Sequence, residues 1–520
     1  DSIISVIIDE SGSMGPCRSD TIGGFNTFIK EQKDVKGKAT LTLTKFNDHI
    51  SIPYVDRNIV DVEDLSDVTY CPNGSTALFD AIGNTVKAIE AQTEADPVAL
   101  MMGFLTAFGS IVGREPHFPI EATKHGTRLF FVLVGQTAKA RKGTSWDHIE
   151  KLFRLVDPIW VDNIQTGLSS GEGVIWAVRD PIKKKKPYKG KTGMTYQEVI
   201  EDEGVNDKRL LIMEGEFAST LKVLDREGNN LSPVIRNAWD GKPLQSLTKN
   251  SPAKSTGAHI SIVGHITVSE LSRYLSPTES SNGFANRFLW ICVRRSKCLP
   301  FGGSLTEADM ESILERLKLA ITQARQVKKV YWSKESAGIW RSIYPDLSAG
   351  TPGLIGSLTA RAEAQAIRLA AIYALLDCSD VIKPSHLFAA LAIWDYALAS
   401  TKFIFKDKFT DDPLANKIMA FLVDNPDGYT RTDINNLFGR NEPSKNISEA
   451  LGTLQELGLA KQKESEGISQ GRPSEIWYTE LRKKRNINHN SFISSETKSF
   501  LMRAKEAWAE QLPLPPTSNL

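Results

Sequence analysis

Four apolar runs, rich in β-branched residues and each followed by a polar loop, most constrain the fold of this chain. They span residues 3–8, 128–134, 209–213 and 259–263. Continuous apolar runs of this length are typical of strands buried on both faces, as in parallel sheets whose crossovers are helices. The sequence therefore predicts an α/β fold with polar groups gathered where the strands end.

Composition limits the class of protein but not its partner. The 520 residues are enough for about three domains. Hydrophobic residues make up 41% and charged residues 24%, values that argue against wholesale disorder. The net charge of +1 says nothing about nucleic acid, because a neutral protein can carry a basic face. The five cysteines form no CxxC pair, which favours a reducing cytoplasm over a disulfide scaffold.

No targeting or membrane-spanning segment is predicted. A signal peptide is not visible, and the missing initiator Met suggests a fragment. The most apolar stretch, residues 99–112, is shorter than the roughly 18–20 residues that cross a bilayer. We therefore expect a buried helix there and no membrane partner.

The first apolar run ends in a loop of oxygen-bearing side chains. A carboxylate and two hydroxyls at alternate positions can converge on Mg²⁺ at the carboxyl end of a strand. A helix-like segment, two strands at 40–46 and 50–55, and a glycine turn follow. The motifs DESGSM, GGFN and GSTALFDAIG resemble the von Willebrand factor type A family. The resemblance implies a divalent ion, bridging to an acidic ligand on a protein partner, held by Asp9, Ser11, Ser13 and Thr76.

That family continues with a further strand and a Thr-Asp-Gly loop, which this sequence lacks after Gln92. The resemblance therefore implies an incomplete Rossmann-like sheet over residues 1–92, with strands missing and one acidic metal ligand fewer.

The run at 128–134 leads into a loop with glycine and basic residues, and then into a helix. Such a loop can bind phosphates through backbone N–H groups, with lysine at the outer phosphates and a hydroxyl on Mg²⁺. The loop departs from the GxxxxGK[ST] pattern, since Ala140 replaces the second glycine and RKGTS replaces GK[ST]. A basic turn without nucleotide is the alternative. The candidate nucleotide-binding residues are Gly135, Lys139, Arg141, Lys142, Gly143, Thr144 and Ser145.

The next two strands supply complementary groups. The run at 209–213 ends in Glu214 and Glu216, and a phosphate-loop enzyme needs a carboxylate to hold Mg²⁺ or orient water. The run at 259–263 is followed by His265, a polar group near the expected γ-phosphate. Further on, Arg287 fits an arginine supplied to a neighbouring subunit's site.

In this order, the phrases VLVGQTAKARKGTS, SSGEGVIWAVRDP, LLIMEGEF, NGFANRFLW and ARAEAQAIRLAAIYALLD resemble a helicase-like ATPase family of phages, plasmids and genomic islands. The resemblance covers about residues 94–400 and implies a RecA-like core that uses ATP and Mg²⁺. It implies Lys142 and Thr144 at the phosphates and metal, and Glu216 on the acidic strand. Arg287, Arg361 and Arg368 would be trans or sensor arginines; ion pairs are the alternative for the last two.

Two basic segments are candidates for DNA contact. Six lysines between 183 and 191 predict a solvated loop, with contact to a phosphate backbone as the alternative. Residues 411–482 predict three helices and a β-hairpin, which resemble a winged helix whose third helix can enter a major groove. Its DNA-binding candidates are Arg440, Lys445 and Arg472, with protein contact as the alternative.

The leading hypothesis is a cytoplasmic, Mg²⁺-dependent, helicase-like ATPase that acts on single-stranded or replication-origin DNA of a mobile element. Its catalytic residues would be Lys142, Glu216 and Arg287, and the trans arginine requires a homo-oligomer. The expected domains are the incomplete von Willebrand factor A-like domain at 1–92, an ATPase core at 93–300 and a helical subdomain at 301–410. The winged helix at 411–482 and a C-terminal tail at 483–520 follow. The alternatives are a nucleotide-sensing DNA-binding regulator without efficient turnover, and a Mg²⁺-dependent protein-interaction module at the N-terminus.

Overall fold

The computed structural model divides the chain into two compact units, between Thr85 and Val86. It describes residues 2–9, 18–35, 37, 39–46, 50–72, 85–136, 138–190, 193–247, 253–303, 307–405, 410, 412–425, 427–464 and 475–479. The boundary expected near residue 92 lies inside the second unit, where Lys297 forms a 3.1 Å ion pair with Glu90.

Among its described residues, the first unit contains a small three-stranded sheet, one α-helix and the short 3-10 helix Ile59–Asp61. Strand β1 (Ser2–Asp9) pairs in parallel with β2 (Ala39–Phe46), which pairs antiparallel with β3 (Ile50–Asn58). Helix α1 (Arg18–Asp34) contributes Phe25 and Ile29 to the core, whereas Phe28, expected on the same face, is partly exposed. The predicted strand, helix and two strands are confirmed. The side chain of Asp9, together with Ser11, Ser13 and Thr76, lies outside the described residues, so the metal site stays a prediction.

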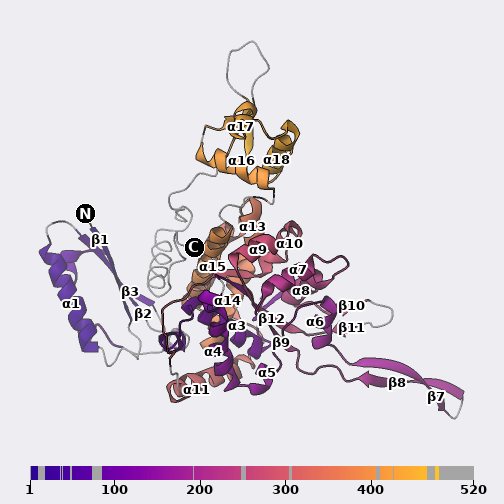
Figure 1. The fold of residues 1–520 in the computed structure, drawn as a ribbon. Coiled ribbons are helices and arrows are strands. Elements are labelled where there is room, and N and C mark those ends of the chain that lie inside the picture. The colour runs from indigo at the N-terminus through magenta and orange to yellow at the C-terminus, as the bar shows by residue number, and fades with distance from the viewer. Residues whose placement is uncertain are drawn as a thin grey trace. The chain divides into compact units, whose positions relative to one another are not determined.

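The second unit is built on a four-stranded parallel sheet. Its strands are β6 (Phe130–Val134), β9 (Arg209–Glu214), β12 (His259–Ile266) and β13 (Leu289–Cys292), in the order β13-β6-β12-β9. Every pair in this sheet is parallel. The apolar runs at 128–134, 209–213 and 259–263 therefore form the buried strands predicted from their composition, and the α/β fold class is confirmed (Figure 1).

Helices cover both faces of this sheet. Helix α3 (Pro97–Val112) packs against β6, β9 and β12, and His259 Nε2 donates to the carbonyl of Gly109 at 2.9 Å. Helices α7 (Phe217–Leu224) and α8 (Leu231–Asp240) also pack on β12, and Phe217 lies against Gly264. Because successive strand residues point to opposite faces, these helices lie on opposite sides. The buried helix predicted around residues 99–112 is confirmed.

Further helices surround this core. By length and composition, α15 (Pro384–Ile404) could cross a membrane, but most of it is buried, as in a core helix packed on β13. The other helices are α4 (Lys142–Arg154), α5 (Pro158–Asp162), α6 (Gly171–Ala177), α9 (Val268–Tyr274), α10 (Pro277–Ser281), α11 (Glu307–Ala324), α12 (Lys334–Ser348), α13 (Gly353–Thr359) and α14 (Ala362–Leu376).

Four two-stranded sheets accompany the main sheet. They are β4 (His117–Ile120) with β5 (Thr123–Gly126), β7 (Ile182–Gly190) with β8 (Gly193–Asp202), β10 (Leu244–Ser246) with β11 (Ala253–Ser255), and β14 (Tyr331–Trp332) with β15 (Val381–Ile382). The β7–β8 pair overturns the predicted loop around the lysine run, because Lys183 to Lys186 and Lys189 lie in β7; Lys191 lies outside the described residues.

The carboxyl-terminal part contains three helices and a small antiparallel sheet. Its elements are α16 (Pro413–Asp424), β16 (Tyr429–Thr430), α17 (Arg431–Leu437), α18 (Ser444–Glu456), β17 (Lys461–Glu464) and β18 (Glu475–Tyr478). The predicted helices and strands are confirmed. Thr430 and Asp433 form a capping box at the start of α17, and Leu457 is 40% exposed at the end of α18. Arg472 lies outside the described residues.

Candidate active site

The carboxyl ends of the four parallel strands meet at one edge of the sheet. The register pairs Ile266 of β12 with Val134 of β6, and Gly264 with Glu214 of β9. The loops that follow these strands therefore begin at nearly the same level. The amide of Gly135, the first loop residue after β6, donates to the carbonyl of Ile266 at 3.2 Å. The predicted phosphate loop, which follows β6, thus shares one edge with His265 and the acidic end of β9, as expected from the sequence.

Lys142 is the first residue of α4 and lies over the loop that precedes the helix. Its Nζ donates to the carbonyls of Gly135 at 3.2 Å and Gln136 at 2.7 Å. Partial burial lowers the pKa of the Lys142 ammonium, and the charge of Glu270 opposes this shift. An ammonium has three protons, so one remains for an anion at this edge.

His265 lies beside this ammonium as a buried imidazole. Burial, and then the positive charge of Lys142, lower the pKa of His265 to about 4. Its Nε2 has no hydrogen-bond partner among the described residues. His265 is therefore neutral at pH 7 and has a nitrogen available for a ligand at the carboxyl edge.

The two carboxylates at the end of β9 have different surroundings. Glu214 is buried, and its Oε1 accepts a 2.7 Å hydrogen bond from the amide of Leu168. Glu216 is exposed at the start of α7, and its carboxylate makes no hydrogen bond within the described part of the chain. Glu216, the residue chosen from the sequence, is accordingly the carboxylate that can reach a metal ion or water.

The two hydroxyl residues of α4 also differ. The Oγ of Ser145 donates to the carbonyl of Lys142 at 2.6 Å, and the side chain is buried in the helix. Ser145 was predicted to bind nucleotide; its hydroxyl is engaged inside the helix, and this role stays a prediction. Thr144, one residue earlier, is only partly buried and is the better metal ligand.

Arg141 is tied to a carboxylate that the sequence did not single out. Its Nε lies 2.6 Å from Glu94, which also binds Arg295 and accepts from the amide of Leu299 at 2.7 Å. These hydrogen bonds, Arg295 foremost, lower the pKa of Glu94 to about 2. Glu94 therefore joins the phosphate loop to the segment after β13, and Arg141 acts there instead of on a nucleotide as expected.

The predicted arginines lie at the opposite, amino-terminal edge of the sheet. Arg287 precedes the first residue of β13, and its guanidinium is buried in a 3.0 Å ion pair with Asp240. Arg368 is buried and donates to the carbonyl of Trp239 at 2.8 Å, and Arg361 lies 4.9 Å over the Trp239 ring. These side chains lie away from the loop after β6 of their own chain, and their trans and sensor roles stay predictions. The ion-pair alternative describes Arg361, which lies 3.9 Å from Asp240, whereas Arg368 donates to the backbone carbonyls of Arg128 and Trp239.

Another arginine, which the sequence analysis missed, does lie at the carboxyl edge. Arg294 follows β13 and is exposed, and its amide donates to Asp96 at 2.9 Å. The neighbouring carbonyl of Val293 lies against Gly135 in the phosphate loop. The signal that could have found Arg294 is its position two residues after an apolar strand.

A metal ion at this edge would need ligands from the nucleotide. Among the described residues, no group of three or more His, Cys, Asp or Glu side chains could hold a metal by itself. Mg²⁺ in nucleotide sites is commonly held by one or two carboxylates, a hydroxyl and substrate phosphates. Thr144 and Glu216 fit this pattern, whereas Lys139 is exposed without a contact that assigns it a role.

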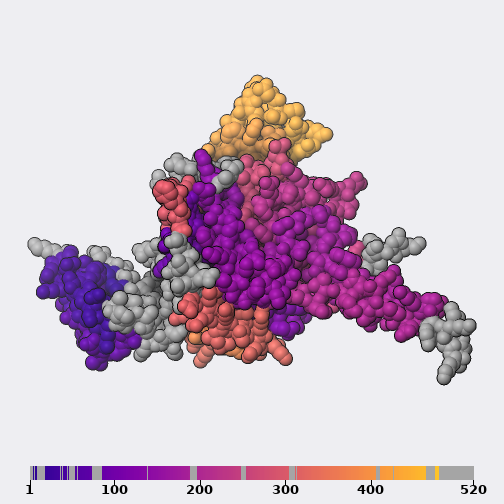
Figure 2. All heavy atoms as spheres, turned by 60° about the horizontal axis from the view of Figure 1, so that its bottom comes forward, coloured from indigo at the N-terminus to yellow at the C-terminus, as the bar shows by residue number. Residues whose placement is uncertain are grey.

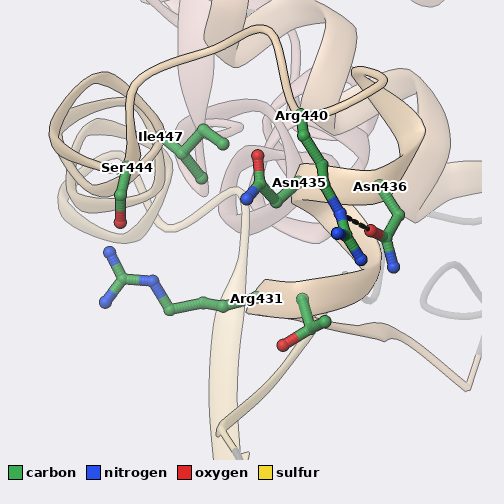
Figure 3. Close-up of a pocket in the computed structure, with 7 residues that line it drawn as sticks. Arg431, Asn435, Asn436, Arg440, Ser444 and Ile447 are labelled. Carbon is green, nitrogen blue, oxygen red and sulfur yellow. Dashed lines mark hydrogen bonds between the residues drawn. The ribbon is translucent and has the colours of Figure 1, made fainter.

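The carboxyl-terminal part presents a polar pocket of about 520 Å³ (Figure 3). Arg440, predicted to bind DNA, lines this pocket, and its Nε donates to Asn436 at 3.0 Å. Lys445 is exposed on α18, 3.8 Å from Glu449. Arg431, which the sequence analysis missed, is a second basic residue of the pocket. The lining residues are Arg431, Thr432, Asn435, Asn436, Arg440, Ser444 and Ile447.

No protein-family model matches this chain, and no curated protein matches it. The resemblances drawn from its motifs therefore remain predictions. The function must be argued from the geometry of the carboxyl edge.

Two glycines of the phosphate loop should respond differently to alanine. A Cβ at Gly135 would lie 2.6 Å from the carbonyl oxygen of Val293, whereas a Cβ at Gly143 would meet nothing within 4 Å. We expect Gly135→Ala to lower the free energy of unfolding by about 1–3 kcal/mol, because backbone must move. Gly143→Ala should change it by less than about 0.5 kcal/mol. Urea unfolding measures both; equal stabilities would contradict this loop geometry.

Proposed function

We propose that the second unit is a Mg²⁺-dependent ATP hydrolase, helicase-like, that acts on DNA. The observation that carries this proposal is the meeting of Lys142, His265 and the exposed Glu216 at the carboxyl edge of one parallel sheet. The strand order supports it, since β12 lies between the phosphate-loop strand and the acidic strand, as in the RecA-like cores that the motifs resemble.

The residues of this edge divide the chemistry as follows. The first amides of α4 point toward a bound phosphate, and the helix dipole favours its negative charge. Lys142 neutralises the β- and γ-phosphates, and Thr144 ligates Mg²⁺. Glu216 orients a water molecule toward the γ-phosphorus, or binds the metal. The water oxygen forms a bond to the γ-phosphorus as the bond to the bridging oxygen breaks, ADP leaves with that oxygen, and the proton that water loses passes to a phosphate oxygen.

His265 and Arg294 add two further groups. A neutral imidazole at the end of β12 can donate a hydrogen bond to a γ-phosphate oxygen or to the attacking water. The exposed guanidinium of Arg294 can contribute the positive charge that was assigned to Arg287 from the sequence. Because Arg287 is buried with Asp240, an obligatory homo-oligomer no longer follows from it.

DNA contact by the winged-helix part belongs to the same proposal. Arg431 and Arg440 bring two guanidinium groups to one open pocket beside the start of α18. Guanidinium groups and helix N-termini are common contacts to DNA phosphates. The cytoplasmic location and the role in mobile-element replication depend on the motif resemblance.

ATP hydrolysis by the full chain is the direct test. We expect phosphate release that requires Mg²⁺, is abolished by EDTA and rises when single-stranded DNA is added. Nucleotide binding without phosphate release would support the regulator alternative. Failure to bind ATP at millimolar Mg²⁺ would rule out both.

A further inference from the structure

Strands β7 and β8 form a two-stranded ribbon that pairs with no other strand in the described structure. Figures 1 and 2 show the ribbon extending away from the four-stranded sheet of its own unit. An isolated two-stranded hairpin is only marginally stable in water, because neither face is covered. A long uncovered ribbon therefore indicates a surface that meets a partner.

The ribbon carries positive charge on both faces. Lys183 and Lys185 lie on one face and Lys184 and Lys186 on the other, because strand residues alternate. Lys183 lies 3.9 Å from Glu198, and Lys184 lies 2.7 Å from Glu201. Lys185 and Lys186 are exposed and form no ion pair with any described residue. Glu198 lies opposite Lys185 in the strand register, so each face carries two of these lysines and one of these carboxylates, a net positive charge.

Apolar groups are exposed beside these cations. Tyr196, which pairs with Pro187, is 73% exposed, and Ile200, which pairs with Lys183, is 48% exposed. Exposure of an aromatic ring to water is unfavourable, so such a ring is not expected on a hairpin that contacts only solvent. Lysines interleaved with an aromatic side chain are typical of nucleic-acid contacts, in which the ring packs on sugars or bases.

The base of the ribbon is firmly attached to the ATPase core. Arg179, at the end of α6, forms a 2.9 Å ion pair with Asp202 of β8. Lys208, directly before β9, forms a 3.0 Å ion pair with Asp180, which also accepts hydrogen bonds from Thr256. These contacts lie at the point where the ribbon leaves the core, so its direction is defined by the core.

We propose that the β7–β8 ribbon is an arm that binds double-stranded DNA. A two-stranded β-ribbon fits the major groove, where lysines on both faces can reach the phosphates of the two DNA strands. The exposed lysines favour a negatively charged partner. The width of a two-stranded ribbon favours the major groove of a duplex. This inference rests on the proposed action of the protein on DNA, but it does not require ATP hydrolysis.

The test compares two double variants of the full chain without nucleotide. Lys185→Gln with Lys186→Gln removes the two cations that form no ion pair with a described residue, and Lys328→Gln with Lys329→Gln removes two exposed lysines between α11 and β14 as the control. Fluorescence anisotropy at several salt concentrations gives the Kd for a duplex of about 30 base pairs. We expect the ribbon variant to bind about 10-fold more weakly at physiological salt, with a salt slope smaller by about 2. The control should match the wild type.

The outcomes separate this inference from the proposed ATPase. Unchanged duplex affinity in the ribbon variant, or a defect confined to single-stranded DNA, would overturn the arm. Tyr196→Ala, which leaves the charge unchanged, should also weaken duplex binding without changing the salt slope. Basal ATP hydrolysis without DNA should be equal in all variants. If none of the proteins hydrolyses ATP but the ribbon variant still binds duplex DNA more weakly than the wild type, the DNA-binding arm is supported. The ATPase proposal is then overturned.

Discussion

Replacing Lys142 with alanine should lower the rate of ATP hydrolysis by at least about 100-fold at saturating Mg²⁺. The ammonium is the cation closest to the loop carbonyls of Gly135 and Gln136, where the outer phosphates of ATP would lie. No other lysine of α4 begins the helix, so its charge is not replaced by a neighbour. Phosphate release measured at several ATP concentrations separates this loss into kcat and KM.

Lys151 provides the matched control on the same helix. It is exposed near the carboxyl end of α4, away from the phosphate loop, so Lys151→Ala should hydrolyse ATP at the wild-type rate. Unfolding curves for both variants would show that the difference is not one of stability. A Lys142→Ala protein that is fully active would contradict the assigned phosphate site.

Replacing Arg287 with alanine should lower the free energy of unfolding by about 3 kcal/mol. The side chain of Arg287 is 6% exposed and lies 3.0 Å from Asp240, so its removal leaves a largely buried carboxylate without its closest partner. A cavity at the amino-terminal edge adds to this loss. Urea unfolding measures the change.

An exposed arginine supplies the comparison. Arg341→Ala, on the outer surface of α12, should change the stability by less than about 0.5 kcal/mol. A folded Arg287→Ala protein should still hydrolyse ATP. If it were as stable as the wild type but inactive, Arg287 would act at a neighbouring subunit after all, and its assignment to a structural ion pair with Asp240 would be wrong.

The strands of the second unit could be predicted because a strand that is buried on both faces has a continuous apolar sequence. The runs at 128–134, 209–213 and 259–263 are apolar at consecutive positions, and all three became strands of one sheet. The strand order could not be predicted, since it depends on long-range pairing that no local pattern records. Polar loops after these strands were correctly expected to share an edge, because parallel strands end together.

The edge of the sheet at which each arginine lies could not be predicted because one strand was not recognised. β13 spans only Leu289–Cys292, too short for a distinct pattern. Without it, nothing indicated that Arg287 precedes a strand and lies at the amino edge, or that Arg294 follows the same strand and lies at the carboxyl edge. A difference of seven positions thus moves an arginine from one side of the sheet to the other.

The lysine run was predicted as a loop for a different reason. Lysine has low strand propensity, and a strand exposed on both faces shows no apolar–polar alternation in its sequence. The partner strand β8 begins at Gly193, and its pairing with β7 supplies the hydrogen bonds that hold the lysines extended. The inward position of the Ser145 hydroxyl could not be predicted either. Which side chains of α4 face inward depends on how the helix packs, and the sequence alone does not give this packing.

The position of Lys142 has a thermodynamic consequence for ligand capture. Its ammonium has already lost part of its water shell in the folded protein, and neutral carbonyl oxygens hold it near the place of an incoming phosphate. Part of the dehydration and ordering cost of this group is therefore met on folding, before a ligand binds. A polyphosphate that binds here would exchange neutral acceptors for anionic ones, which is electrostatic preorganisation of the loop.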